Sequence, residues 1–391
     1  MSSPSETLPP INESEIRRLL GELGEAAAEY RFHIAPNPAV GAAVLSDGVE
    51  IARGFHIRWG GPHAEVNAIE AACGGLASAD RWDTLVVTLE PCSTTGKTPP
   101  CTELIQATGI KRVIVGSLDP NPNHRGKGLE LLQRAGIEVV YLAGASPLES
   151  VSPHFIRWTS FDRLRRPRPW VIAKWAQTRT GQLSPPADIG DGRWISCEES
   201  RDEVHRMRAN VDAIVTGVGT VLRDDPRLTV RGVDAPNGGP LRIVVDSDLR
   251  TPPTARLFDL PGEGEAAGIV TIVCRPGAHP RSHRTLVREG VNVVICGLDD
   301  NGRVNVRELL TRLWDGGVRR VMLEAGTTLC RAFFEHDLID QVRVYTGAVN
   351  GGEGETLAEW IGPERVRKAA FRESGVDGVM DAFVGRDFPR G

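Results

Sequence analysis

The sequence predicts an α/β protein of two domains, and three observations lead to this class. The chain has 391 residues, which exceeds one ordinary hydrophobic core. Short apolar runs alternate with helical stretches along most of its length, as in layered α/β folds. A basic, proline-containing stretch at 163–169 interrupts that alternation. We therefore expect one domain at 1–150, a connector at 151–169 and a second domain at 170–391.

The first domain is expected to begin with a polar tail at 1–12 and an amphipathic helix at 13–31. Apolar side chains recur there at helical spacing, and Asn12 and Ser14 are the two candidate caps. Strand-like and helix-like segments then alternate, which predicts an α/β layered sandwich. The strand-like segments are 40–45, 85–89, 112–116 and 137–142, and the helix-like segments are 65–72, 102–108 and 129–135.

The second domain is expected to form another α/β layer. Its candidate strands are 170–174, 213–217, 241–246, 269–274, 291–296, 320–323 and 341–346, with helices at 200–209 and 304–314. Gly217-Val218-Gly219 begins like a dinucleotide-binding glycine motif, but the third glycine is missing, so a Rossmann unit is not expected. A better phosphate cradle is 323–329, where a strand leads through small residues into a helix.

Composition narrows the class of protein. Hydrophobic residues make up 40% and charged residues 25%, an ordinary soluble globular mixture, and the net charge of −5 argues against nucleic-acid binding. Seven scattered cysteines predict a reducing compartment without a disulfide framework. The N-terminal residues lack a signal-peptide pattern, and no apolar run approaches the roughly 18 residues of a membrane span. We therefore expect a cytoplasmic protein that binds neither nucleic acid nor membrane.

A histidine, two cysteines and a carboxylate form the most informative pattern: His63-Ala64-Glu65, then Pro91-Cys92, then Cys101. Zinc takes imidazole and thiolate ligands in a tetrahedral shell, and three protein ligands leave the fourth position for water. The metal lowers the pKa of that water from roughly 16 to about 7. A further group must move protons between the water and a leaving amine, and Glu65 is placed for that task. The pattern is the signature of zinc deaminases.

The expected local structure supports these ligands. The apolar run 85–89 ends just before Cys92, and Pro100 places Cys101 at a helix N-terminus, where the helix dipole favours thiolate. We expect His63 to lie at the start of another helical stretch. Only at a helix start can His63 and Glu65, which are two residues apart, converge on one metal. The alternative is that both cysteines are buried apolar residues and the histidine lies on the surface, but four matching elements in order argue against it.

Residues 34–130 resemble the deaminase half of the bifunctional riboflavin-biosynthesis deaminase-reductases. The resemblance is carried by 36–41, His56, 63–66, 90–101 and 119–122. The eight residues between Cys92 and Cys101 distinguish this family from deaminases with Cys-x-x-Cys spacing. The chain departs from the family at Thr94, where a histidine is usual.

The loop between the two cysteines, 93–100, combines small residues with Lys97 and Thr98, which suits a phosphate. The alternative for Lys97 is a solvated loop lysine. The family resemblance implies a small phosphoribosyl pyrimidine as the substrate. It also implies which residues bind that substrate: Asn37, His56, Ser93, Lys97, Thr98, Asp119 and Asn121.

Residues 170–346 resemble the reductase domain of the same family, and the residues after them do so weakly. The resemblance implies a dihydrofolate-reductase-like fold after an N-terminal cytidine-deaminase-like three-layer domain, and NADPH as the cofactor beside Zn2+. It implies dinucleotide binding by Ala176, Trp194, Thr220, Asp224, Ser247, Gly326, Thr327 and Thr328. It implies substrate binding by Arg208, Leu228, Arg231 and Glu324. Two arginines suit a phosphate dianion, and the alternative is that they form surface ion pairs.

This half also departs from the family. Thr178-Arg179-Thr180-Gly181 stands where Ser-Leu-Asp-Gly is usual, Gly192 replaces a substrate-binding serine, and Gly347 to Gly352 replaces Ala-Pro-Lys-Leu-Leu-Gly. The departures favour an alternative function, an active deaminase whose C-terminal domain only binds ligand or supports assembly. A nucleic-acid base deaminase is a third hypothesis, which the acidic charge and few aromatic residues oppose.

The expected function is two consecutive steps of riboflavin biosynthesis. In the first, Glu65 moves protons during zinc-dependent hydrolytic deamination of a pyrimidine. In the second, NADPH delivers hydride to the ribose C1 carbon, which converts a ribosyl into a ribityl chain, while the protein aligns the reactants. The family resemblance also implies a homo-oligomer.

Overall fold

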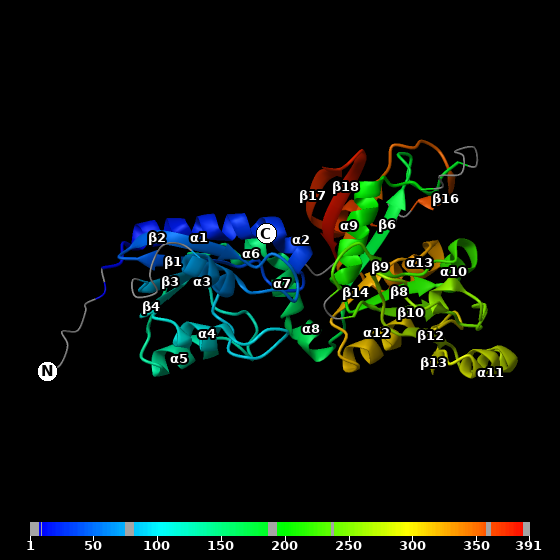
Figure 1. The fold of residues 1–391 in the computed structure, drawn as a ribbon, viewed down its shortest axis with the longest axis horizontal. Helices are drawn as coiled ribbons and strands as arrows, with labels where there is room; N and C mark the ends of the chain where they lie inside the picture. The colour runs from blue at the N-terminus through cyan, green and yellow to red at the C-terminus, as the bar shows by residue number, and fades with distance from the viewer. Residues whose placement is uncertain are drawn as a thin grey trace. The chain divides into compact units, whose positions relative to one another are not determined.

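The computed structural model describes residues 8, 10–74, 82–186, 194–235, 238–356 and 361–385. These residues form two compact units, within 1–165 and within 166–387 (Figure 1). Each unit has its own sheet and its own apolar core, as the sequence predicts for two α/β domains. Among the described residues, none of the helices is both long and apolar enough to cross a lipid bilayer.

The first unit is built on a five-stranded sheet in the order β2-β1-β3-β4-β5. β1 pairs antiparallel with β2 and β3, whereas β3, β4 and β5 are parallel. The strands are β1 (Gly41–Ser46), β2 (Val49–Phe55), β3 (Thr84–Val87), β4 (Arg112–Val115) and β5 (Glu138–Tyr141). The four expected strands are present within two residues at each end, and β2 is the strand that the sequence pattern missed. Its burial alternates between exposed and half-buried positions, so it lacks a continuous apolar run.

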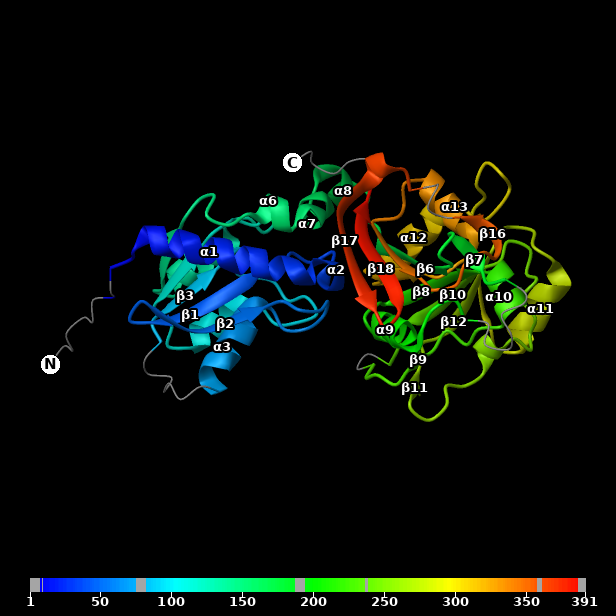
Figure 2. The same cartoon turned by 90° about the horizontal axis from the view of Figure 1, so that it is seen from above.

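Helices cover both faces of this sheet. α1 packs through Ile16, Leu20 and Leu23 on one face, and α3, α4 and α5 pack on the other through Ala68, Ile105 and Leu132. Figure 2 shows α1 lying along the sheet. The helices are α1 (Glu13–Ala27), η1 (Ala28–Tyr30), α2 (Arg31–Ile34), α3 (Ala64–Gly74), α4 (Cys101–Ala107), α5 (Lys127–Arg134), α6 (Leu148–Val151), α7 (Pro153–Trp158) and α8 (Phe161–Arg165). This is the expected three-layer arrangement.

Two local features refine the expectations for the first unit. Asn12, not Ser14, caps α1, because its side chain accepts from the Glu15 N–H at 3.4 Å. The stretch 151–169, expected as a connector, contains α7 and α8, and Phe155 of α7 lies in the apolar core of the first unit.

The second unit is built on a nine-stranded sheet in the order β13-β12-β10-β8-β14-β6-β15-β18-β17. The strands from β13 to β15 are parallel, and β18 and β17 add an antiparallel edge. These strands are β6 (Trp170–Gln177), β8 (Ala213–Gly217), β10 (Leu241–Val245), β12 (Val270–Cys274), β13 (Asn292–Ile295), β14 (Arg320–Leu323), β15 (Gln341–Thr346), β17 (Val366–Ser374) and β18 (Asp377–Val384). All seven expected strands are found.

Helices again lie on both faces. α12 and α13 share one core with the sheet, and α10 and α11 share another. The helices are α9 (Glu198–Ala209), α10 (Val218–Asp224), η3 (Arg256–Phe258), α11 (Pro280–Arg288), α12 (Val306–Asp315), α13 (Thr327–Glu335) and η5 (Pro363–Arg365). Two short antiparallel pairs complete the unit: β9 (Val230–Arg231) with β11 (Glu265–Ala266), and β7 (Gln182–Ser184) with β16 (Glu353–Thr356).

The antiparallel edge of this sheet is joined to the parallel part by a buried ion pair. Arg343 of β15 and Asp381 of β18 are partners in register, and two hydrogen bonds of 2.6 and 2.8 Å connect their side chains. Both side chains are almost fully buried. Because an unpaired charge is costly in such a place, the pair favours this register of β18 against β15.

Candidate active sites

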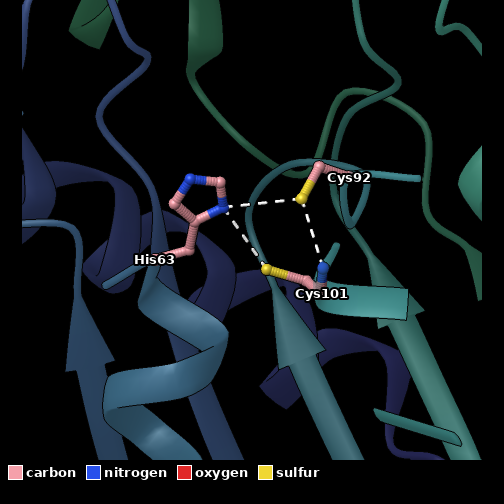
Figure 3. Close-up of side chains that lie close together, drawn as sticks. All are labelled: His63, Cys92 and Cys101. Carbon is pink, nitrogen blue, oxygen red and sulfur yellow. Dashed lines mark hydrogen bonds between the residues drawn. The ribbon is translucent and has the colours of Figure 1, made fainter. Parts of the chain in front are cut away.

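Three side chains of the first unit converge as a metal-binding group. His63 immediately precedes α3, Cys92 lies in the loop after β3, and Cys101 is the first residue of α4. Their ligand atoms all lie within 4.8 Å of one another. His63 Nδ1 is 3.5 Å from the Cys92 sulfur and 3.3 Å from the Cys101 sulfur (Figure 3). The sequence therefore predicted both the three residues and the helix start at Cys101.

Backbone contacts fix the two cysteines relative to each other. The Cys101 N–H donates to the Cys92 sulfur at 3.2 Å. The N–H and the hydroxyl of Thr102 both donate to the Cys92 carbonyl oxygen, each at 3.2 Å. The first turn of α4 is thus bonded to the loop that carries the other cysteine.

The donor chemistry of this group fits zinc. The hydrogen bond with Cys101 lowers the pKa of the Cys92 thiol, whereas the same bond and burial raise the pKa of the Cys101 thiol. The two thiols therefore differ in how readily each one ionises. A divalent cation at their centre would allow both to be thiolates beside a neutral imidazole. Two sulfurs and one imidazole are a zinc donor set that leaves a fourth position open, as catalytic sites do.

The second nitrogen of His63 also has a partner. Its Nε2 lies 3.4 Å from the Thr98 hydroxyl oxygen, which can accept the Nε2–H. Such a contact orients a histidine ligand and leaves Nδ1 for the metal. The family resemblance implies that Thr98 binds substrate, and the structure places its hydroxyl on the metal-ligating histidine.

Glu65 occupies the first turn of α3 and is only 3% exposed. Burial raises the pKa of its carboxyl group, and the carboxyl interacts with His63 and Cys101. A buried carboxyl group beside the ligands can hold and release protons there.

Asn37 and His56 lie on the histidine side of the metal-binding group. Asn37 Nδ2 donates to His56 Nε2 at 3.1 Å, and His56 Nδ1–H donates to the Pro62 carbonyl oxygen at 2.8 Å. An amide NH2 only donates and a carbonyl only accepts, so these bonds fix the imidazole tautomer. The His56 and His63 rings are 5.3 Å apart between centroids.

A cavity of about 230 Å³ lies beside Cys92, which is one of its lining residues. Ser93, Asp119 and Asn121, three expected substrate-binding residues, line it. The remaining lining residues are Glu90, Pro91, Thr94, His124, Phe155, Trp158, Thr159 and Leu164. Lys97 is exposed in its loop, with its ammonium 3.9 Å from the centre of the Trp59 ring.

Glu90 holds the loop that carries Asp119. Its buried carboxylate accepts from the backbone N–H groups of Asp119 at 3.1 Å, Gly126 at 2.8 Å and Gly128 at 2.9 Å. A Cβ on Gly128 would lie 2.1 Å from the Pro91 carbonyl oxygen, so only glycine permits this approach. Sequence analysis missed this role, although Glu90 directly precedes the Pro91-Cys92 motif.

In the second unit, Arg208 and Glu324 form a paired cluster. Arg208 of α9 donates to both Glu324 carboxylate oxygens, at 2.7 and 3.0 Å, and to the Thr229 carbonyl oxygen at 3.0 Å. The ammonium of Lys174, from β6, lies 3.7 Å from the same carboxylate. Burial opposes ionisation of Glu324, but the charges of Arg208 and Lys174 outweigh it and lower its pKa to about 2. Arg208 is therefore not in a surface ion pair, and Lys174 is a site residue that the sequence did not indicate.

The two other expected substrate residues, Leu228 and Arg231, flank Thr229, whose carbonyl oxygen accepts from Arg208. Leu228 is buried and has a positive φ of 53°. The backbone N–H of Arg231 donates to His205 Nδ1 at 3.2 Å. Burial, and then the charges of Arg208 and Arg231, lower the pKa of His205 to about 4.

Several expected dinucleotide-binding residues fall at one edge of the sheet. Ala176 is near the end of β6, Thr220 follows β8, Ser247 follows β10 and Gly326 follows β14. These four parallel strands are neighbours, in the order β10-β8-β14-β6. Because the carboxyl ends of parallel strands share an edge, the four residues are brought together where α/β folds bind ligands. Thr327 and Thr328 begin α13 directly after Gly326.

The remaining expected cofactor residues have other surroundings. Asp224 is bonded to its neighbour Arg223 at 2.9 and 3.1 Å. Trp194 is 65% exposed, with the Arg201 guanidinium 5.4 Å from its ring centre. Neither residue is placed with the strand-end group by a described contact.

The turn 178–181 follows β6 and departs from the family pattern. Several hydrogen bonds hold it in place. The Gly351 N–H donates to the Thr180 hydroxyl at 2.9 Å, the Thr180 hydroxyl donates to Gln182, and Arg179 N–H donates to the Val349 carbonyl oxygen at 2.7 Å. Thr180 thus joins the two segments in which the chain departs from its family. Gly192 lies outside the described residues.

Two family models match the chain. The model for the cytidine and deoxycytidylate deaminase zinc-binding region matches residues 15–117, and the model for the RibD C-terminal domain matches residues 169–379. The latter covers more than half of the chain.

Relatives match over almost the full length. The riboflavin biosynthesis protein RibD of Aquifex aeolicus is 36% identical over 333 residues, which are 85% of this chain and 87% of the relative. The Escherichia coli K12 protein of the same name is 32% identical, over 88% of this chain and 90% of its own. A solved Thermotoga maritima deaminase/reductase has 30% identity and a TM-score of 0.62, and covers 95% of this chain and 99% of its own.

We expect the E90Q variant to bind deaminase substrate more weakly. In the wild type both carboxylate oxygens of Glu90 accept from backbone N–H groups, whereas the amide NH2 of glutamine would face one of these N–H groups and could not accept from it. Losing one charge-assisted bond of about 1.5–3 kcal/mol corresponds to a rise of roughly tenfold or more in KM. Ammonia release at varied substrate concentration measures it. Glu130 on α5 is exposed, so E130Q should leave KM unchanged. Equal KM values in both variants would contradict the role of Glu90.

The T98V variant should bind zinc about 10–100-fold more weakly, since it keeps the shape of threonine but removes the oxygen that faces His63 Nε2. Competition against a chromogenic chelator measures the zinc affinity directly. T98S, which keeps the hydroxyl, should stay close to the wild type. Unchanged affinity in T98V would show that this contact does not orient the ligand.

The stability of the second unit should decrease as the pH is lowered, because of His205. Its folded pKa of about 4 lies below the unfolded value of about 6.5. The unfolded state therefore binds a proton first, and the contribution of this group declines from pH 6.5 to about 4. Thermal unfolding midpoints at pH 7 and pH 5 should differ less in H205Q than in the wild type. An equal difference in the two proteins would refute the shift.

Proposed function

This chain belongs to the bifunctional RibD family of riboflavin biosynthesis, and on that premise we propose the substrates, the cofactor and the residues of its two reactions. The first unit is the deaminase, with its zinc-binding group at His63, Cys92 and Cys101, and the second is the reductase. The solved Thermotoga maritima relative is described as a diaminohydroxyphosphoribosylaminopyrimidine deaminase and 5-amino-6-(5-phosphoribosylamino)uracil reductase. We assign the same two substrates to this chain.

Glu65 is the proposed catalytic residue of the deamination. Zinc, when bound, would lower the pKa of a water so that hydroxide is available near neutral pH. Glu65 takes the proton of the attacking water, then delivers protons to the ring nitrogen and to the departing ammonia. Its burial beside Cys101 and His63 keeps this transfer away from bulk water.

The surrounding side chains orient the substrate. His56 is held in a fixed orientation by Asn37 and Pro62, so its ring offers the pyrimidine a fixed packing surface. Asp119 and Asn121 line the cavity beside Cys92, where they can bind the polar groups of the ring. Lys97, in its small-residue loop, is assigned to the phosphate.

In the second unit, we propose NADPH as the nicotinamide cofactor that a reductase requires. It would lie along the strand-end group of Ala176, Thr220, Ser247 and Gly326, with Trp194, Asp224, Thr327 and Thr328 also assigned to it from the family resemblance. When bound, NADPH would supply the hydride for the ribose C1 carbon of the open-chain imine, whose nitrogen would take up a proton from solvent. The chain supplies the alignment of cofactor and substrate.

The substrate of the reductase would bind at the Arg208–Glu324 cluster. Glu324 holds Arg208 and Lys174 together through charge. These two cations and Arg231 provide donors for a sugar phosphate, and Leu228 is assigned an apolar contact with the substrate. We further propose that the protein acts in the cytoplasm as a homo-oligomer, as the family resemblance implies.

The observation that carries this proposal is the convergence of His63, Cys92 and Cys101 with Glu65 beside them. The test supplies zinc-loaded protein with diaminohydroxyphosphoribosylaminopyrimidine and NADPH, and follows ammonia and NADPH absorbance together. Both signals are expected. E65Q should lose ammonia release by a factor of about 10²–10⁴, yet oxidise NADPH normally when given the deaminated substrate.

The other outcomes separate the two halves. Ammonia without NADPH consumption would leave an active deaminase whose second domain binds ligand or supports assembly, and the Thr180 and Gly192 departures would then need testing. Full ammonia release by E65Q would remove Glu65 from the mechanism.

A further inference from the structure

One wall of the cavity beside Cys92 is formed by residues that lie outside the matched deaminase region. The matched region ends at residue 117, yet the cavity beside Cys92 is also lined by Phe155, Trp158, Thr159 and Leu164. These four belong to α7, α8 and the turn between them. The metal ligands and Glu65 lie within the matched region, whereas these four residues lie after it.

Hydrogen bonds fix α7 to the segment that carries Asn37. The buried His154 donates from Nε2 to the Asn37 carbonyl oxygen at 2.7 Å. The hydroxyl of Ser152 accepts from the Ala39 N–H at 2.8 Å. Phe155 is only 9% exposed and packs in the apolar core. The wall is therefore held rigidly against the site and is not a loose linker.

Trp158 is the largest group that this wall presents to the cavity. The Arg163 guanidinium lies 4.9 Å from its ring centre, a contact that restrains the indole. Asp119 and Asn121 line the same cavity. A cavity lined by an indole, a carboxylate and an amide suits a flat heterocycle with hydrogen-bond donors on its edge.

We propose that Trp158 is a substrate-binding and specificity-determining residue of the deaminase, packing against the aminopyrimidine part of the substrate. The phosphate is excluded from this side by the Asp119 carboxylate and is left to Lys97. The inference rests on the proposed function, since it concerns the substrate of that reaction. In this proposal α7 adds Trp158 to the substrate-binding residues assigned above.

The chain provides a matched control for testing the wall. Phe161 on α8 also carries a guanidinium over its ring, that of Arg165 at 5.3 Å, but Phe161 is 71% exposed and does not line the cavity. The test compares W158L, W158F and F161L by steady-state ammonia release and by bound zinc. W158L should raise KM about tenfold, the low end for a lost apolar contact, with normal zinc content and little change in kcat.

The controls make the outcome decisive. W158F should recover most of the affinity because it keeps an aromatic face, and F161L should match the wild type. If W158L behaves like F161L, the wall takes no part in binding and the inference is wrong. If W158L instead loses zinc or kcat, Trp158 is a structural residue and the inference is also wrong. A wild-type protein that releases no ammonia would overturn the proposed function itself.

Discussion

The structure of the first unit depends on bringing two thiols and one imidazole to a single point. Each ligand comes from a different place in the fold: the start of α3, the loop after β3 and the start of α4. Two sulfurs at this separation cannot both ionise easily, and the opposite pKa shifts of Cys92 and Cys101 express that conflict. A divalent cation relieves it, so metal binding and the local fold support each other.

Further side chains surround this metal-binding group and position its ligands and its neighbouring loops. Thr98 faces the outer nitrogen of His63, and Glu90 organises the loop that presents Asp119. Farther out, α7 and α8 close the cavity through Trp158. The second unit applies the same physical principle to a different group, because the Glu324 carboxylate keeps Arg208 and Lys174 close together in a buried place. In both units, buried charge is tolerated because opposite charge or backbone N–H groups surround it.

Local signals made part of this predictable. The spacing of His63, Cys92 and Cys101 indicated the metal site, and continuous apolar runs indicated the buried strands. Other features depend on tertiary contacts that no local pattern encodes. The role of Glu90 needs three N–H groups that lie 29, 36 and 38 residues away in the chain. Lys174 lies within an apolar strand and gains its role only from the pairing of β6 with β14. β17 was missed because its many polar residues hide the strand pattern, and β18 because Asp377 and Asp381 interrupt its apolar run.

The metal centre is the claim on which the rest depends, and X-ray absorption at the zinc edge tests it most directly. The protein loaded with one equivalent of zinc should show two sulfur ligands at about 2.3 Å and one nitrogen at about 2.0–2.1 Å, with a fourth light-atom ligand. C92S should lose one sulfur from that shell. A shell without sulfur, or one filled by four protein sulfurs and nitrogens, would contradict an open catalytic site at His63, Cys92 and Cys101.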